Sequence, residues 1–245
     1  MSIYLLPLAA PAVLLIAAAA AASRPGRRPG LIPGLAEASA LAALVVSIAS
    51  AVVLWLESAG TSPLLGVAGI GLSSRLDVIS ATMLVLVSFV GWVVVRYSTS
   101  YLDGEARQGA FLGWMTTTLA CVLVLVQAGN LVLFVAAWVA TGLSLQRLLL
   151  FYADRTQAIR AGRKKFVTAR LGDAAMIGAA VVLYAGFGTA DIASILTAAG
   201  SAEAPAGTLW AAALLALAAA LKSAQFPSHG WLTEVMETPT PVSAL

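Results

Sequence analysis

Charged residues are scarce in this sequence. Asp, Glu, Lys and Arg make up 10% of the 245 residues, against about 25% in a typical soluble domain. Hydrophobic residues make up 60% of the chain, and the mean hydropathy is +0.94. A chain with so few charges cannot cover a water-facing surface with polar groups. The composition therefore excludes a soluble domain and indicates an integral membrane protein.

Cysteine and histidine occur only once each. Cys121 lies inside an apolar run, so no disulfide can form within the chain, and a small buried apolar residue is expected there. His229 has no second histidine or cysteine at the spacing of zinc ligands. We therefore predict that this chain itself holds neither a metal ion nor a cofactor.

Apolar runs of about 20 residues recur along the chain, each long enough to cross roughly 30 Å of hydrocarbon as a helix. We place them at 3–22, 36–56, 76–96, 110–127, 131–151, 167–185 and 209–226, with an eighth beginning at Pro239. The first run lacks the basic start and the small-residue cleavage site of a signal sequence, so it counts as a span. The predicted fold class is an all-α, polytopic transmembrane helix bundle of about seven spans.

Basic residues are unevenly distributed over the loops. They follow the first, third and fifth runs: Arg24, Arg27, Arg28, Arg96, Arg107, Arg155, Arg160, Arg163, Lys164 and Lys165. The alternate loops, 57–75 and 186–208, contain only Arg75. By the positive-inside rule, the amino terminus lies outside and the basic loops, including 23–34, lie in the cytoplasm of a cell (inner) membrane protein. This orientation explains the basic loops, so we expect no nucleic acid partner.

Lys222 lies near the end of the apolar run LWAAALLALAAALKSAQFPSHGW. A charge at the centre of a bilayer costs roughly 2.5–3.5 kcal/mol on insertion scales, so it must be paired, hydrated or functional. Pro227 follows five residues later, and we expect the helix to break beside the charge. A lysine at a helix break within the membrane indicates an ion path, with a purely structural ion pair as the alternative.

Three more charged residues lie within the predicted spans. Arg170 and Asp173 are three apart, so they share a helix face and can pair with each other, or Asp173 can pair with Lys222. Arg147 lies in the fifth run, and both arginines could instead extend to the nearby membrane surface. Burial disfavours a charged lysine and a neighbouring carboxylate favours it, so a lysine–aspartate pair could load and release a proton. His229 could relay protons as well, or only pack.

Several motifs resemble those of a known family. The segment KSAQFPSHGWLTEVMETPTPVSAL (222–245) resembles a signature of the antiporter-like, proton-conducting subunits of complex I (L-type) and of Mrp-type cation/proton antiporters. Further matching segments follow in the same order: LDVISATML (76–84), SYLDGEARQGAFLGWM (100–115), NLVLFVAAW (130–138), GLSLQRLLLFY (142–152) and KKFVTARLGDAAM (164–176). The resemblance spans about residues 70–245. It implies that Lys222 sits on a broken seventh helix and transfers protons, and that Arg170 and Asp173 match the family's RxGD segment.

One departure from the family indicates a subgroup. Complex I subunits carry a glutamate directly after the tryptophan that matches Trp138, whereas this sequence has Val139. The pattern SLQRLLLFYADR (144–155) is more similar to DabB subunits of DAB-type inorganic carbon transporters. That resemblance implies a large cytoplasmic, zinc-binding DabA-like partner, related to β-carbonic anhydrases, that hydrates CO2. It also implies that protons or sodium ions flow through the membrane subunit, with Arg147 acting in place of the missing glutamate.

The resemblance also predicts how the chain is organised. Residues 1–108 would form leading helices 1–3, and 109–245 the first antiporter-like unit, helices 4–7 with the start of helix 8. The second, inverted unit of that fold is missing, so we expect a fragment or a chain completed by another. Two competing functions stay open. One is a proton-pumping subunit of an NADH-quinone oxidoreductase or an Mrp-type antiporter; the other is a non-conducting scaffold for a soluble partner.

Overall fold

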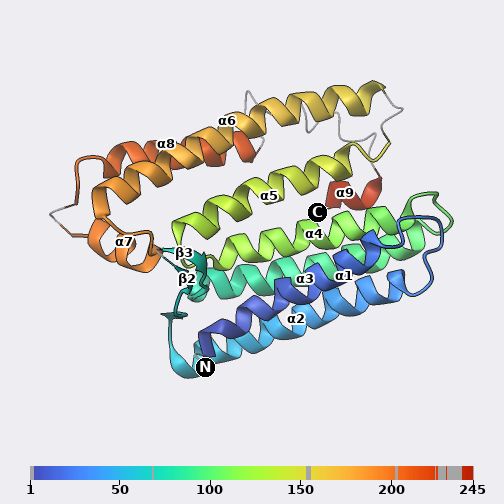
Figure 1. Cartoon of the computed structure of the whole chain (residues 1–245), viewed down its shortest axis with the longest axis horizontal. Helices are drawn as coiled ribbons and strands as arrows, with labels where there is room; N and C mark the ends of the chain where they lie inside the picture. Colours follow the sequence, from blue (N-terminus) through green and yellow to red (C-terminus); the bar gives the residue numbers. More distant parts are fainter. Residues whose placement is uncertain are drawn as a thin grey trace.

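The structure is a bundle of long helices that run side by side (Figure 1). The computed structural model describes residues 3–67, 69–152, 156–201, 204–223, 225, 230 and 239–244. Within these ranges, six helices are long and apolar enough to cross a membrane. They connect in sequence order through turns at alternate ends of the bundle. The chain is therefore a polytopic, mostly helical membrane protein.

The helices begin and end close to the predicted apolar runs. A 3₁₀ turn, Ile3–Leu8, leads into the first α-helix, and the α-helices are α1 Ala9–Ala22, α2 Ile32–Glu57, α3 Val78–Tyr101, α4 Gln108–Gln127, α5 Leu131–Leu149, α6 Thr156–Phe187, α7 Ile192–Ala199, α8 Thr208–Lys222 and α9 Thr240–Ala244. The largest difference is at α6, which begins eleven residues before the predicted run. Its first turns are polar and rich in Arg, Lys and Ala. These residues favour a helix without raising hydropathy.

The all-α prediction is wrong for the connection between α2 and α3. This segment forms two short antiparallel pairs of strands, β1 Gly60–Thr61 with β4 Arg75–Leu76 and β2 Leu65–Val67 with β3 Ile70–Leu72. A Gly/Ser/Pro stretch cannot continue a helix, so its backbone groups find their partners across strands instead. Asp77 then caps α3, because its side chain accepts a hydrogen bond from the Ser80 backbone N–H (2.8 Å). Aspartate is one of the residues preferred at this cap position.

The first four helices form one tightly packed group. α1 packs on α2 and α4, and α3 packs on α2 and α4. Buried alanines of α1, such as Ala10 and Ala17, let the helices approach closely. At Gly91 of α3 the approach is close, because an added Cβ would lie 2.5 Å from Leu119 Cδ1 of α4.

The second half of the bundle is more open. α5 contacts α4 on one side and α6 on the other, while α8 packs along α6 (Figure 1). α8 has 15 residues, about 22 Å of helix, which is short of the roughly 30 Å that a span needs. α8 ends at Lys222, beside which we predicted a break, and the chain that follows lies largely outside the described residues. The seventh predicted span is therefore a shorter helix within the described residues.

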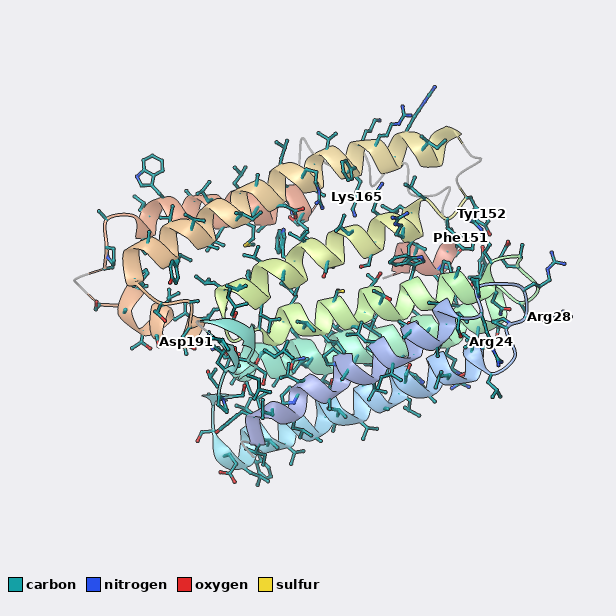
Figure 2. All side chains as sticks on the ribbon, viewed as in Figure 1. Arg24, Arg28, Phe151, Tyr152, Lys165 and Asp191 are labelled. Carbon is teal, nitrogen blue, oxygen red and sulfur yellow. The ribbon has the colours of Figure 1, made fainter. Side chains whose placement is uncertain are left out.

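The two ends of the bundle differ in character. At one end, the loop after α1 contacts the loop after α3 through the Arg28–Asp103 ion pair (3.2 Å). The loop after α3 in turn contacts the residues after α5, because Arg107 donates a hydrogen bond to the Phe151 carbonyl. Figure 2 shows Arg24, Arg28 and Tyr152 gathered at this end, which we call the basic end. The strands and Asp191 lie at the opposite end, the strand end.

The start of the predicted eighth helix lies against the first group. α9 contacts α3, and the Thr240 hydroxyl lies 3.3 Å from the Tyr101 hydroxyl. Val242 is buried in the same apolar core as α1–α4. α4 packs on α1 and α3 as well as on α5. The division into leading helices 1–108 and an antiporter-like unit 109–245 stays a prediction.

Candidate functional site in the membrane region

A cavity of about 50 Å³ lies where α5, α6 and α8 meet. It is lined by Trp138, Thr141, Gly142 and Leu145 of α5, by Lys165, Thr168, Ala169, Gly172 and Asp173 of α6, and by Leu221 and Lys222 of α8. Gly172 contributes no side chain, and an added Cβ there would lie 3.6 Å from the Ala218 carbonyl oxygen of α8. Three separate helices therefore bring their polar groups to one small, mostly apolar space.

Lys222 reaches this cavity from the last residue of α8. Its Nζ donates a hydrogen bond to the Trp138 carbonyl oxygen (2.8 Å). The same Nζ lies 3.8 Å from the centroid of the Trp138 ring, which is the arrangement of a cation–π contact. Both partners are neutral. Among the described residues, the direct partners of Lys222 are thus neutral, and Asp173 acts on it through the electrostatic field.

Arg170 and Asp173 form the predicted pair on one face of α6. Arg170 Nη2 lies 2.6 Å from Asp173 Oδ2, and the Asp173 side chain is only 8% exposed. Neither Asp173 Oδ2 nor Arg170 Nε has a hydrogen-bond partner among the described residues, so the contact is an ion pair without an aligned hydrogen bond. The Arg170 guanidinium also lies over the Phe166 ring, 5.3 Å from its centroid.

The structure adds a residue that the sequence analysis assigned to a basic loop. Lys165 lies within α6 and is 6% exposed. Its Nζ donates a hydrogen bond to the Gly142 carbonyl oxygen of α5 (2.6 Å), and Figure 2 shows it between these two helices. It follows two exposed basic residues, Arg163 and Lys164. The helical period could have singled it out, since Lys165 lies eight residues, about two turns, before Asp173.

The other predicted residues lie elsewhere. Arg147 does not line the cavity; its guanidinium lies over Trp114, 5.8 Å from the ring centroid, beside a separate groove between α5 and α6. His229 lies outside the described residues. Within the described part of the chain, no three His, Cys, Asp or Glu side chains lie close enough together to hold a metal ion.

The cavity can exchange protons rather than bind a large ligand. Its volume suits about one or two water molecules, and its lining holds two lysines and one aspartate. Lysine and aspartate interconvert between charged and neutral forms when their surroundings change. In an apolar membrane region such groups mark ion and proton pathways.

Two profiles of known protein families match the chain. "NADH:quinone oxidoreductase/Mrp antiporter, TM" matches residues 128–245, and "NADH-Ubiquinone oxidoreductase (complex I), chain 5 N-terminus" matches 65–112. The first contains every residue of the cavity. The fold and the site thus define an antiporter-like membrane subunit.

Individual relatives agree with this class. The "Probable inorganic carbon transporter subunit DabB" of Hydrogenovibrio crunogenus is 44% identical over 68% of this chain and 32% of its own length. DabB2 of Halothiobacillus neapolitanus, named in the same way, is 41% identical over 98% of this chain and 45% of its own length. The NADH-quinone oxidoreductase subunit L of Mycobacterium tuberculosis (strain H37Rv) is 37% identical over 70% of this chain. This chain spans less than half the length of these relatives.

Solved structures show the same fold. The Mrp complex from Dietzia sp. DQ12-45-1b matches 97% of this chain with a TM-score of 0.76 and 26% identity, over 26% of the matched chain. The archaeal membrane-bound sulfane sulfur reductase matches 98% of this chain with a TM-score of 0.75 and 15% identity, over 48% of the matched chain. The chain belongs to the antiporter-like membrane subunit family of complex I and Mrp antiporters. Its relatives include DabB subunits at 41–44% identity.

Proposed function

We propose that this chain is the ion-conducting membrane part of an energy-coupled inorganic carbon transporter and is not itself an enzyme. The observation that carries the proposal is the position of Lys222, at a helix end inside the bundle and beside the Asp173 cavity. The choice of transporter rests on identity, which is 44% and 41% to two DabB subunits and 37% to a subunit L.

As protons or sodium ions pass through the chain, Lys222 would alternate between its protonated and its neutral form. Lys222 is protonated when the field of Asp173 dominates and neutral when Arg170 alone compensates the carboxylate. Because the Arg170–Asp173 contact is an ion pair without an aligned hydrogen bond, a small shift of α6 against α8 changes that balance. Arg147, between the cavity and the basic end, would extend the path towards that end, and His229, outside the described residues, would relay protons as well.

Val139 supports a coupling that differs from that of complex I. It follows Trp138 on α5 and packs among apolar residues of α5, α6 and α8. It therefore brings no carboxylate to Lys222. The hydration of CO2 would take place on a large cytoplasmic, zinc-binding DabA-like partner, and ion flow through this chain would drive that reaction in one direction.

Transport by the intact complex tests the proposal. The full-length membrane subunit would be produced with its large cytoplasmic partner in bacteria that lack their own carbonic anhydrases. We expect growth in ordinary air and uptake of ¹⁴C-labelled bicarbonate, and we expect Lys222→Met to reduce uptake at least tenfold with normal membrane insertion. Uptake that is unchanged in Lys222→Met would mean that the chain only anchors its partner.

A second candidate function is favoured by the structural match to the Mrp complex, at a TM-score of 0.76. In that case the chain would exchange cations for protons, or pump protons within an NADH-quinone oxidoreductase. Purification of the tagged membrane subunit from its own host separates the candidates. Co-purifying redox subunits or Mrp subunits would support this second function, and a large zinc protein would support the first.

A further inference from the structure

We propose that Lys165 is a second proton-exchanging residue of the site, which shares one proton with Lys222 across the cavity between α5, α6 and α8. The inference rests on the proposed ion-conducting function and deepens it. In this inference, Lys165 is the residue of the proton path that follows Lys222 in the direction of the basic end.

The first support is the common surface that both lysines use. Lys222 Nζ binds the Trp138 carbonyl (2.8 Å) and Lys165 Nζ binds the Gly142 carbonyl (2.6 Å). These acceptors are four residues apart on α5, so they lie on one face of the helix, separated by about 6 Å along its axis. Two amino groups from different helices thus occupy neighbouring turns of the same helix face.

The second support is the charge of the groups that face this space. α6 contributes Lys165, Arg170 and Asp173, α8 contributes Lys222, and α5 contributes no titratable side chain to the described lining. Asp173 is already balanced by Arg170 (2.6 Å). Among the described residues, the direct partners of the two lysines are the two carbonyls and the Trp138 ring. Two ammonium groups one helical turn apart repel each other where water is scarce, so a proton on one favours the neutral amine of the other.

The proton step balances simply. An N–H bond of the Lys165 ammonium breaks, one water molecule in the cavity passes the proton on, and an N–H bond forms on the neutral Lys222 amine. The total charge stays constant, which keeps the step compatible with an apolar environment. Gly142 is nearer than Trp138 to the end of α5 that lies at the basic end. Lys165 therefore connects Lys222 towards that end.

The test measures proton flux by the full-length subunit with its partner in lipid vesicles that contain a pH-sensitive dye. Lys165→Arg keeps the charge and can still bind the Gly142 carbonyl, but arginine does not release its proton in this pH range. We expect at least a tenfold loss of flux in Lys165→Arg and in Lys165→Met. Lys164→Met is the matched control, since this neighbouring lysine is exposed, and it should conduct normally.

Further variants make the result decisive. Lys165→His can exchange protons near neutrality, so it should restore at least a third of the flux, with a pH dependence that the wild type lacks. Normal flux in Lys165→Arg would overturn the inference, because a purely structural lysine tolerates that change. If Lys222→Met also conducts normally, the proposed function itself fails. If only Lys222→Met loses flux, the assignment of Lys165 alone is wrong. Size-exclusion profiles exclude variants that misfold.

Discussion

Among the described residues, the two lysines of the cavity are bound directly by neutral groups. Lys165 and Lys222 donate hydrogen bonds to backbone carbonyls of α5. The buried Asp173 pairs with Arg170 instead. Two unit charges about 6 Å apart interact by about 3 kcal/mol at an effective dielectric of about 20. Simultaneous charging of both lysines would cost an amount that is large compared with the energy of a single hydrogen bond. The site is therefore suited to hold one mobile proton rather than two fixed ones.

The ion pair on α6 allows a prediction at this scale. Asp173→Asn leaves Arg170 without its partner, and we expect a loss of stability of about 1–2 kcal/mol, less than for a fully buried pair because Arg170 is partly exposed. Ion flux should fall at least tenfold, since the cavity loses its carboxylate. Thermal unfolding in detergent measures the first effect, and dye-reported flux in vesicles measures the second.

A double variant separates stability from function. Arg170→Gln combined with Asp173→Asn removes both charges of the pair, so much of the lost stability should return while the flux stays low. Recovery of flux together with stability would show that the pair only maintains the fold.

The sequence was sufficient to predict the i, i+3 pair, since one helical period brings Arg170 and Asp173 together. The sequence also singled out Lys222 as a candidate site residue, because a single charge in an apolar run is easy to recognise. The sequence did not single out Lys165, because a run of basic residues has low hydropathy and was therefore assigned to a loop. Which of three adjacent basic side chains turns inward depends on how α6 is rotated against α5, and that rotation is a tertiary property.

Among the elements, the turn between α4 and α5 connects several segments at the strand end. Asn130 is buried (3% exposed) and caps α5, because its Oδ1 accepts a hydrogen bond from the Leu133 backbone N–H (2.8 Å). Its Nδ2 donates to the Gly71 carbonyl (3.0 Å) and to the Ser73 hydroxyl (2.9 Å). Backbone bridging to Asp191 attaches the start of α7 to the same residue. One side chain thus joins α5 to the strands, and its backbone joins α5 to α7.

We predict that Asn130→Ala lowers the stability of the bundle by about 2–3 kcal/mol. About 1 kcal/mol comes from the lost helix cap, and the remainder from two buried hydrogen bonds of about 0.5–1 kcal/mol each. Asn130→Ser is the matched control: its hydroxyl keeps an acceptor for the Leu133 N–H but it loses both amide donors, so its loss should be smaller. Thermal unfolding in detergent measures both. Equal losses in the two variants would contradict the assigned cap.

Elements within the membrane were more predictable than those outside it. A span must satisfy its backbone groups internally, so an apolar run of sufficient length implies a helix. The strands β1–β4 and helix α7 lie in connections where water also satisfies the backbone, and composition alone leaves their form open. The predicted runs 110–127 and 131–151 leave room only for a short connection, but the partners of Asn130 come from segments nearly 60 residues away in the chain.

On the scale of the whole molecule, the distribution of charge distinguishes one end of the bundle from the other. The arginines of the loops after α1 and α3 meet at the basic end. Arg75 at the strand end is paired with Asp77 (2.7 Å), so that basic residue is compensated. The positive-inside rule counts basic residues close to the ends of spans. Arg28 at the basic end is paired as well, with Asp103, so the asymmetry rests on the larger number of basic residues at that end.

We predict that the basic end faces the cytoplasm and the amino terminus faces outside. In a Cys121→Ala background, Gly26→Cys at the basic end should resist a membrane-impermeant maleimide in intact cells, and Ser201→Cys at the strand end should react. Both positions are exposed, and no neighbouring atom lies within 4 Å of a Cβ added at Gly26, so both should react once the membrane is opened. Labelling of Gly26→Cys in intact cells would invert the orientation. The Lys165 side of the cavity would then connect to the outside, and a cytoplasmic partner would face the strand end instead.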